Sequence, residues 1–156
     1  MKIALAQLNY HIANFQDNTK KIIHATERAI EAGAGLVIFS ELAICGYPPQ
    51  DLLEQREFID RCIDEIKKLL PYSNQLAIII GGPSLNPSGK GKKLFNSAYL
   101  LHQGKISGIH NKTLLPTYDI FDEYRYFEQN IDFKLGEING EKFAITICED
   151  LWYEQP

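Results

Sequence analysis

Three ionisable side chains each follow a predicted strand of this sequence. They are Glu41 after the apolar run LVIF, Lys112 after KISGIH and Cys148 after AITI. In α/β proteins ligand sites gather beyond the carboxyl ends of strands. These side chains are therefore the first candidates for chemistry.

Together, these residue types suit acyl transfer. A neutral thiol such as that of Cys148 is a weak nucleophile, with a reference pKa of about 8.5, and it needs a base and a cation to activate it. Glu41 can accept the thiol proton and return it to a leaving amine, while Lys112 can stabilise the thiolate and a developing oxyanion. Such a site needs no histidine.

Each of these residues also has a structural interpretation. Free cysteine is among the most buried residue types, so Cys148 taken alone is typical of an inert core thiol. Glu41 and Lys112 taken alone are typical of solvated loops. Cys45 lies close to Glu41 and competes for the role of nucleophile, but a small apolar filler is the favoured interpretation for it.

Two further patterns bear on the site. The segment LPTYDIFDEYRYF (115–127) follows Lys112 and is dense in aromatic and charged residues, which suits either a loop around a small polar ligand or a surface loop that packs its own aromatics. The four histidines have no paired ligand spacing, so no metal site is predicted. They are His11, His24, His102 and His110.

In the first half of the sequence the predicted strands and helices alternate, and in the second half the predicted strands form hairpins. KIALAQL, LVIF and LAIIIGG are expected strands, and helices are expected between them, the first capped by Asp17 or Asn18 and closed by Gly33. Two hairpins follow, LFNSAYLL with KISGIH and FKLGEI with KFAITI. This order predicts a layered α/β domain with a mixed sheet.

Composition narrows the function classes. The 156 residues include 16 basic and 20 acidic side chains, a formal net charge of −4, which predicts no nucleic-acid or anionic-lipid partner. The three cysteines lack CxxC spacing and favour a reducing, cytoplasmic compartment. No run is long enough for a transmembrane helix. The charge balance leaves a small molecule or a protein as the expected partner.

Three motifs, taken together, carry a family resemblance. FSELAICGYPPQDLL (39–53), HNKTLLPTYDIFDEYRYF (110–127) and ITICEDLW (145–152) resemble the amide-hydrolase domain of glutamine-dependent NAD synthetases, a branch of the nitrilase superfamily. The resemblance implies Glu41 as general base, Lys112 as oxyanion stabiliser and Cys148 as nucleophile. It also implies a glutamine pocket lined by Tyr47, Tyr118, Phe121 and Glu149.

The resemblance further implies a fold and a partner. The expected fold is the nitrilase-like αββα four-layer sandwich with mixed sheets, of which residues 1–156 form a single, incomplete hydrolase domain. Ammonia from glutamine would pass to an ATP-dependent synthetase domain that makes NAD, and the SGGxDS-type loop of that domain is absent from this chain. ATP and Mg²⁺ belong to that domain, so no cofactor is expected here. Members of the family commonly form oligomers, so the resemblance also implies a homo-oligomer.

Two alternatives stay open at this point. The first is a stand-alone amidase of the same superfamily that acts on another amide. The second is a non-catalytic fragment that folds only with a partner. Within the last motif, Glu149 is expected to bind the amino group of glutamine, whereas Asp150 is expected to hold the turn after the strand through backbone amides.

Overall fold

The computed structural model describes residues 1–152. Its main sheet has five strands in the order β1-β2-β3-β4-β5, in which β1, β2 and β3 are parallel and β4 and β5 are antiparallel additions. The strands are β1 (Ile3–Ala6), β2 (Leu36–Phe39), β3 (Ala77–Leu85), β4 (Leu94–His102) and β5 (Lys105–Asn111). The predicted mixed sheet is therefore confirmed.

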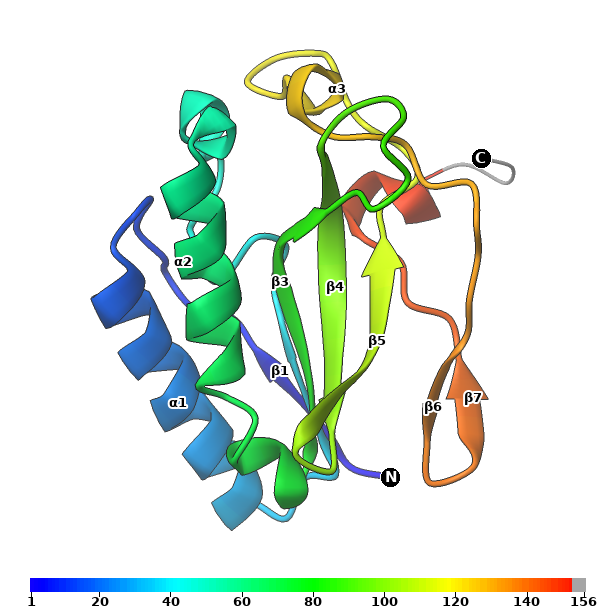
Figure 1. Cartoon of the computed structure of the whole chain (residues 1–156). Helices are drawn as coiled ribbons and strands as arrows, with labels where there is room; N and C mark the ends of the chain where they lie inside the picture. Colours follow the sequence, from blue (N-terminus) through cyan, green and yellow to red (C-terminus); the bar gives the residue numbers. More distant parts are fainter. Residues whose placement is uncertain (153–156) are drawn as a thin grey trace.

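Two helices cover one face of this sheet, as Figure 1 shows. They are α1 (Phe15–Glu31) and α2 (Arg56–Lys67). Alternate residues of β3 explain how both faces become apolar: Ile78 and Ile80 join the core under the helices, whereas Ala77 and Ile79 belong to a second cluster on the opposite face. The first four residues of the strand are thus all apolar, as is typical of a strand buried on both faces.

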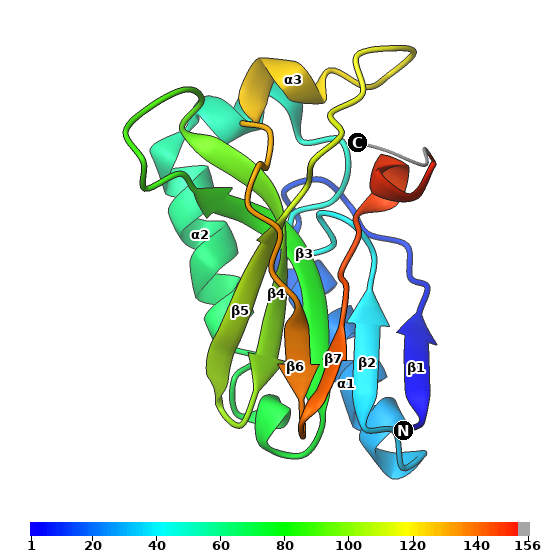
Figure 2. The same cartoon turned by 90° about the vertical axis from the view of Figure 1, so that its right-hand side faces the viewer.

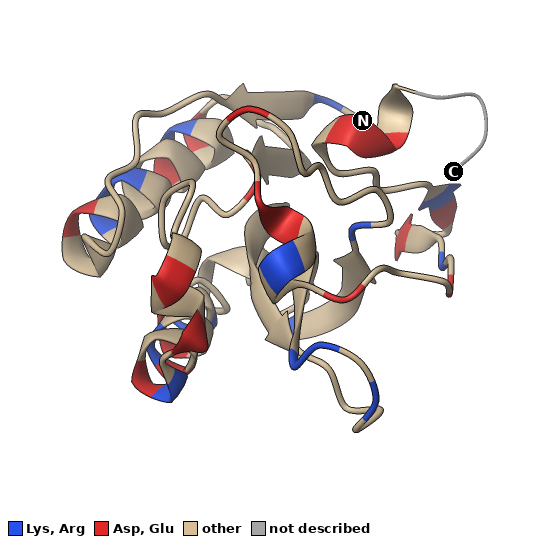
Figure 3. Ribbon diagram, turned by 90° about the horizontal axis from the view of Figure 1, so that it is seen from above, with Lys and Arg blue, Asp and Glu red and all other residues tan. Residues whose placement is uncertain are grey.

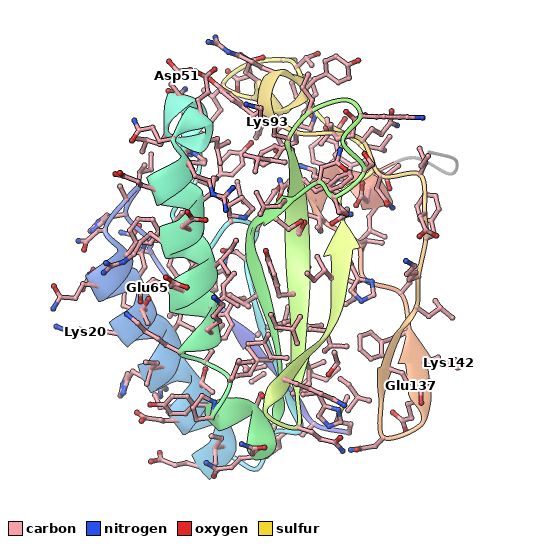
Figure 4. All side chains as sticks on the ribbon, in the orientation of Figure 1. Lys20, Asp51, Glu65, Lys93, Glu137 and Lys142 are labelled. Atoms are coloured by element: carbon pink, nitrogen blue, oxygen red, sulfur yellow. The ribbon has the colours of Figure 1, made fainter. Side chains whose placement is uncertain are left out.

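A short hairpin packs against the opposite face of the sheet, in front of it in Figure 2. Its strands are β6 (Gly136–Ile138) and β7 (Glu141–Phe143), and Ile138 contributes to the second apolar cluster. Glu137 and Lys142 stand opposite each other in this hairpin and are labelled in Figure 4. Of the four expected layers, the described residues form one helical layer, one sheet and a two-stranded part of the second sheet.

The remaining elements are short. They are three 3₁₀ helices, η1 (Gln50–Glu54), η2 (Tyr72–Asn74) and η3 (Cys148–Leu151), and the single-turn helix α3 (Glu123–Tyr126). Basic and acidic residues are interspersed over the ribbon in Figure 3. No helix within residues 1–152 has the length and apolar character to cross a membrane.

The predicted cap of α1 was wrong. Asn14 caps the helix, because its side-chain oxygen accepts the backbone N–H of Asp17 at 3.3 Å. Asn18 is instead fully buried, and its amide binds the backbone oxygens of His11 at 2.8 Å and Ile44 at 3.4 Å. Asn18 is a residue type that often caps helices, but here its side chain makes tertiary hydrogen bonds instead. The predicted Gly33 closure is confirmed by its left-handed φ of 70° just after the helix.

A buried acid joins the two long helices. Glu65 of α2, labelled in Figure 4, is 1% exposed and accepts a hydrogen bond from Thr19 of α1 at 2.9 Å. Lys68 and Arg61 also pair with it, and together these partners outweigh burial and lower its pKa. The two helices are thus joined by a buried hydrogen bond as well as by apolar packing, while the ion pairs of Glu65 stay within or directly after α2.

The last predicted strand is shorter than expected. The hairpin is present, but β7 ends at Phe143 and residues 144–147 pair with no strand among residues 1–152. Ile147 still has extended backbone angles, φ −120° and ψ 114°. A strand needs a neighbour for its backbone hydrogen bonds, and the apolar pattern of AITI cannot reveal whether one is present. The prediction of an extended approach to Cys148 holds, while the prediction of a paired strand does not.

Candidate active site

The structure brings Glu41, Lys112 and Cys148 together at one end of the sheet. Glu41 follows β2, Lys112 follows β5 and Cys148 opens η3. The Lys112 ammonium lies 2.7 Å from Oε1 of Glu41. Glu41 and Cys148 also line one cavity of about 600 Å³ between the sheet and the segment after β7.

Lys112 is fully buried but keeps its charge. Its Nζ donates to Glu41 at 2.7 Å and to Glu123 at 2.9 Å. Burial alone would lower the pKa of Lys112, but the two carboxylates outweigh it and raise that pKa above its usual value. The site therefore contains a permanent positive charge, which is what stabilisation of an oxyanion requires.

Glu123 is a site residue that the sequence did not single out. It is 4% exposed, and burial followed by the charge of Glu41 raises its pKa. Its Oε1 also accepts the hydroxyl hydrogen of Tyr47 at 2.8 Å. The local signal was only one acid among several in DIFDEYRYF, so the sequence pattern could not distinguish Glu123 from the acids beside it.

Cys148 is the exposed cysteine of the three. Its φ of 50° places it in the left-handed region, a conformation that is costly for a residue other than glycine and that clusters at functional sites. Burial and the negative charge of Glu41, only partly offset by Lys112, raise the pKa of the Cys148 thiol. A hydrogen bond with Glu41 acts in the same direction. The Cys148 side chain therefore rests as a thiol beside the Glu41 carboxylate rather than as a preformed thiolate.

Asp150 joins the chain segments that carry Cys148 and Lys112. Its Oδ2 accepts the backbone N–H of Ile147 at 3.0 Å, which confirms the predicted role in the turn. Its Oδ1 accepts two further backbone N–H groups, from Thr113 at 3.0 Å and Leu114 at 2.8 Å. One carboxylate thus joins the turn that carries Cys148 to the segment directly after Lys112.

The four residues predicted for the glutamine pocket gather beside the triad. The Phe121 ring lies between the rings of Tyr47 and Tyr118, at centroid distances of 6.0 and 5.5 Å. The Tyr118 hydroxyl donates to Glu149, which is 6% exposed, at 3.3 Å. The aromatic segment after Lys112 therefore borders the site, and a role in ligand binding stays a prediction.

Other candidates are placed away from the chemistry. Cys45 has no exposed surface and packs in the core with Cys62, which confirms its interpretation as an apolar filler. No cluster of three or more histidine, cysteine or acidic side chains suited to a metal ion occurs within residues 1–152.

Comparison with known proteins identifies the protein family to which this chain belongs. The carbon-nitrogen hydrolase family matches residues 2–156, and this chain belongs to that family. The particular relatives are glutamine-dependent NAD(+) synthetases: that of Synechocystis sp. is 43% identical over 98% of this chain, and that of Aquifex aeolicus is 34% identical over 98%. The branch indicated by the three motifs is therefore confirmed.

Solved structures agree on the fold. The glutamine-dependent NAD+ synthetase from Acinetobacter baumannii superposes with a TM-score of 0.86 over 96% of this chain, at 35% identity. An amidase from Nesterenkonia sp. superposes with a TM-score of 0.82 over 98% of this chain, at 23% identity, and this similarity concerns the fold alone. The chain spans 28% and 26% of the length of the two synthetase relatives named above, 28% of the A. baumannii chain and 57% of the amidase.

Proposed function

We propose that this chain carries the glutamine-hydrolysing site of a glutamine-dependent NAD synthetase. The observation that carries the proposal is the exposed Cys148 thiol beside the Glu41 carboxylate, which is itself held by the buried Lys112 ammonium at 2.7 Å. The identity to NAD synthetases over nearly the whole chain supports glutamine as the substrate.

The first half of the reaction forms a thioester. Cys148 Sγ attacks the side-chain amide carbon of glutamine as Glu41 takes the thiol proton. Lys112 stabilises the oxyanion, and Glu41 then passes the proton to the nitrogen as the C–N bond breaks and ammonia leaves. In the second half Glu41 activates water, which hydrolyses the thioester and releases glutamate.

Substrate recognition is proposed for the aromatic segment and the residue after the nucleophile. The Glu149 carboxylate suits the amino group of glutamine, and its neighbour Tyr118 supplies a second polar group. Tyr47 and Phe121 present apolar rings toward the methylene groups. Because Tyr47 also binds Glu123, which binds Lys112, the pocket is in contact with the charged centre.

The fate of ammonia lies outside this chain. In the proposed reaction sequence a synthetase domain uses ATP and Mg²⁺ to convert nicotinic acid adenine dinucleotide to NAD with that ammonia. In the proposed mechanism residues 1–156 bind neither ATP, Mg²⁺ nor the dinucleotide. They catalyse only the hydrolysis of glutamine to glutamate and ammonia.

The test compares substrates and then maps the nucleophile. Ammonia release from glutamine is measured beside release from simple aliphatic amides, with Cys148→Ala as the inactive variant. Glutamine should be preferred, and an electrophilic glutamine analogue should label Cys148 in peptide mass mapping. Preference for aliphatic amides would favour the stand-alone amidase, and an adduct on Cys45 or Cys62 with Cys148 untouched would overturn the triad.

A further inference from the structure

Asn96 of β4 contacts the carboxylates of Glu41 and Glu123 and the backbone of Lys112. Its side chain is 1% exposed, and its Nδ2 donates to Oε1 of Glu41 at 2.6 Å and to Oε2 of Glu123 at 3.3 Å. Its backbone oxygen accepts the N–H of Lys112 at 2.8 Å. One neutral residue is thus in contact with two carboxylates and with the backbone of the cation between them.

The orientation of this amide is determined by its neighbours. Turning it round would place Oδ1 against two carboxylates, which cannot donate while they are ionised. In the observed orientation Oδ1 is buried and has no hydrogen-bond partner within residues 1–152. An unsatisfied buried acceptor destabilises a folded protein, so the two carboxylate contacts must compensate for it.

Both donors to Glu41 meet the same oxygen. Lys112 Nζ and Asn96 Nδ2 lie 2.7 and 2.6 Å from Oε1. We propose that Asn96 is a positioning residue that holds Oε1 of Glu41 and thereby presents Oε2 to the proton of Cys148. The inference deepens the proposed function and rests on the same triad.

A neutral donor suits this position for an electrostatic reason. Glu41 has to accept a proton, and a second cation beside it would favour its ionised form and weaken it as a base. An amide supplies a directional hydrogen bond without a full charge. It also separates two carboxylates that would otherwise repel each other across a buried site.

The test measures acylation of Cys148 by p-nitrophenyl acetate as a function of pH. The burst of p-nitrophenolate gives the acylation rate, and peptide mapping assigns the adduct. Asn96→Ala removes the donor, and the nearly isosteric Asn96→Asp replaces it with a third carboxylate. Ser84→Ala is the control, because Ser84 is another buried hydrogen-bonding side chain of this sheet that binds Ser97, at 2.7 Å. Thermal unfolding is recorded for every variant.

We expect both Asn96 variants to lower the plateau acylation rate by about tenfold or more, the loss of one hydrogen bond to a charged group. The acid limb of the profile should also move to higher pH, because a carboxylate that loses a donor or gains a like-charged neighbour holds its proton more tightly. Ser84→Ala should leave both features unchanged. A merely structural role would lower the unfolding temperature alone.

The outcomes separate this inference from the proposed function. A wild-type protein that is acylated at Cys148 but releases no ammonia from glutamine would refute the proposed substrate, while the variants still decide the role of Asn96. Unchanged plateau and acid limb in the Asn96 variants would overturn the inference, as would failure of both variants to fold. Absence of acylation at Cys148 in the wild-type protein would overturn both proposals.

Discussion

Lys112 donates a hydrogen bond to Glu123 at 2.9 Å, from the end of β5 to the short helix α3. The contact places the lysine ammonium between two carboxylates, because Glu41 holds it from the other side at 2.7 Å. It also joins the charged centre to the aromatic pocket, since Glu123 binds Tyr47. The Lys112 ammonium is therefore held in place by a residue of the segment that also carries two of the predicted pocket residues, Tyr118 and Phe121.

Replacement of Glu123 should therefore impair turnover more than substrate binding. In Glu123→Gln the ammonium of Lys112 loses one charged partner, and we expect kcat for glutamine hydrolysis to fall by about ten- to a hundredfold, the range of a hydrogen bond to a charged group. Steady-state kinetics with glutamine measure kcat and KM, which separate the effect on turnover from the effect on substrate binding. Glu128→Gln is the control, because Glu128 binds the backbone N–H of Lys92 outside the site. Equal kinetics in the two variants would contradict the assignment.

Glu41→Gln should change alkylation and hydrolysis in opposite directions. The raised pKa of Cys148 means that its thiolate forms at higher pH than an ordinary thiolate, so the pH midpoint of its alkylation by iodoacetamide should lie above that of an unperturbed cysteine. Removing the Glu41 charge should lower that midpoint, whereas glutamine hydrolysis should fall by about a hundredfold or more without its base. Peptide mapping restricts the measurement to Cys148. A midpoint that rises in the variant would refute the electrostatic account.

Asp150→Asn should destabilise the protein and disturb the site. Three backbone N–H groups point at this carboxylate, and an amide offers one acceptor oxygen and a competing NH₂ group. We expect the free energy of unfolding to fall by about 2 kcal/mol or more in denaturant titration, with slower labelling of Cys148. Asp132→Asn is the control, since the Asp132 side chain forms an exposed ion pair with Lys134, at 2.8 Å. Similar losses in both variants would argue against the special role of Asp150.

Gly81 lets the segment around Glu41 cross β3. A Cβ at this position would lie 2.5 Å from both Leu42 N and Ser40 O, which are backbone atoms on either side of Glu41. Gly81→Ala should therefore cost about 1–3 kcal/mol of unfolding free energy and reduce activity. In Gly82→Ala the new methyl group would meet the side chains of Ile44 and Ile66 at 3.0 Å, so the loss should be smaller. The reverse order of stability would contradict this steric explanation.

Much of the local structure was predictable because it depends on neighbours in the sequence. LVIF forms β2 over the predicted residues, and Glu41, Lys112 and Cys148 follow extended segments as expected. Asp150 was assigned to its turn for the same reason, since it acts on the backbone three residues earlier. The three motifs also sufficed to indicate the family. Periodicity, turn chemistry and motif order are properties of short stretches, and short stretches are what a sequence displays.

Only the tertiary structure decided which distant groups share one site. It placed Glu123 and Asn96 in contact with Lys112 and Glu41. It showed that Asn18 is buried and binds the backbone of His11 instead of capping the helix. It also left residues 144–147 without a strand partner among the described residues. It also showed that Cys148 rests as a thiol, because burial and Glu41 together outweigh the nearby lysine. Burial and Coulomb interactions depend on distance in space, which residue types and their spacing along the chain do not specify.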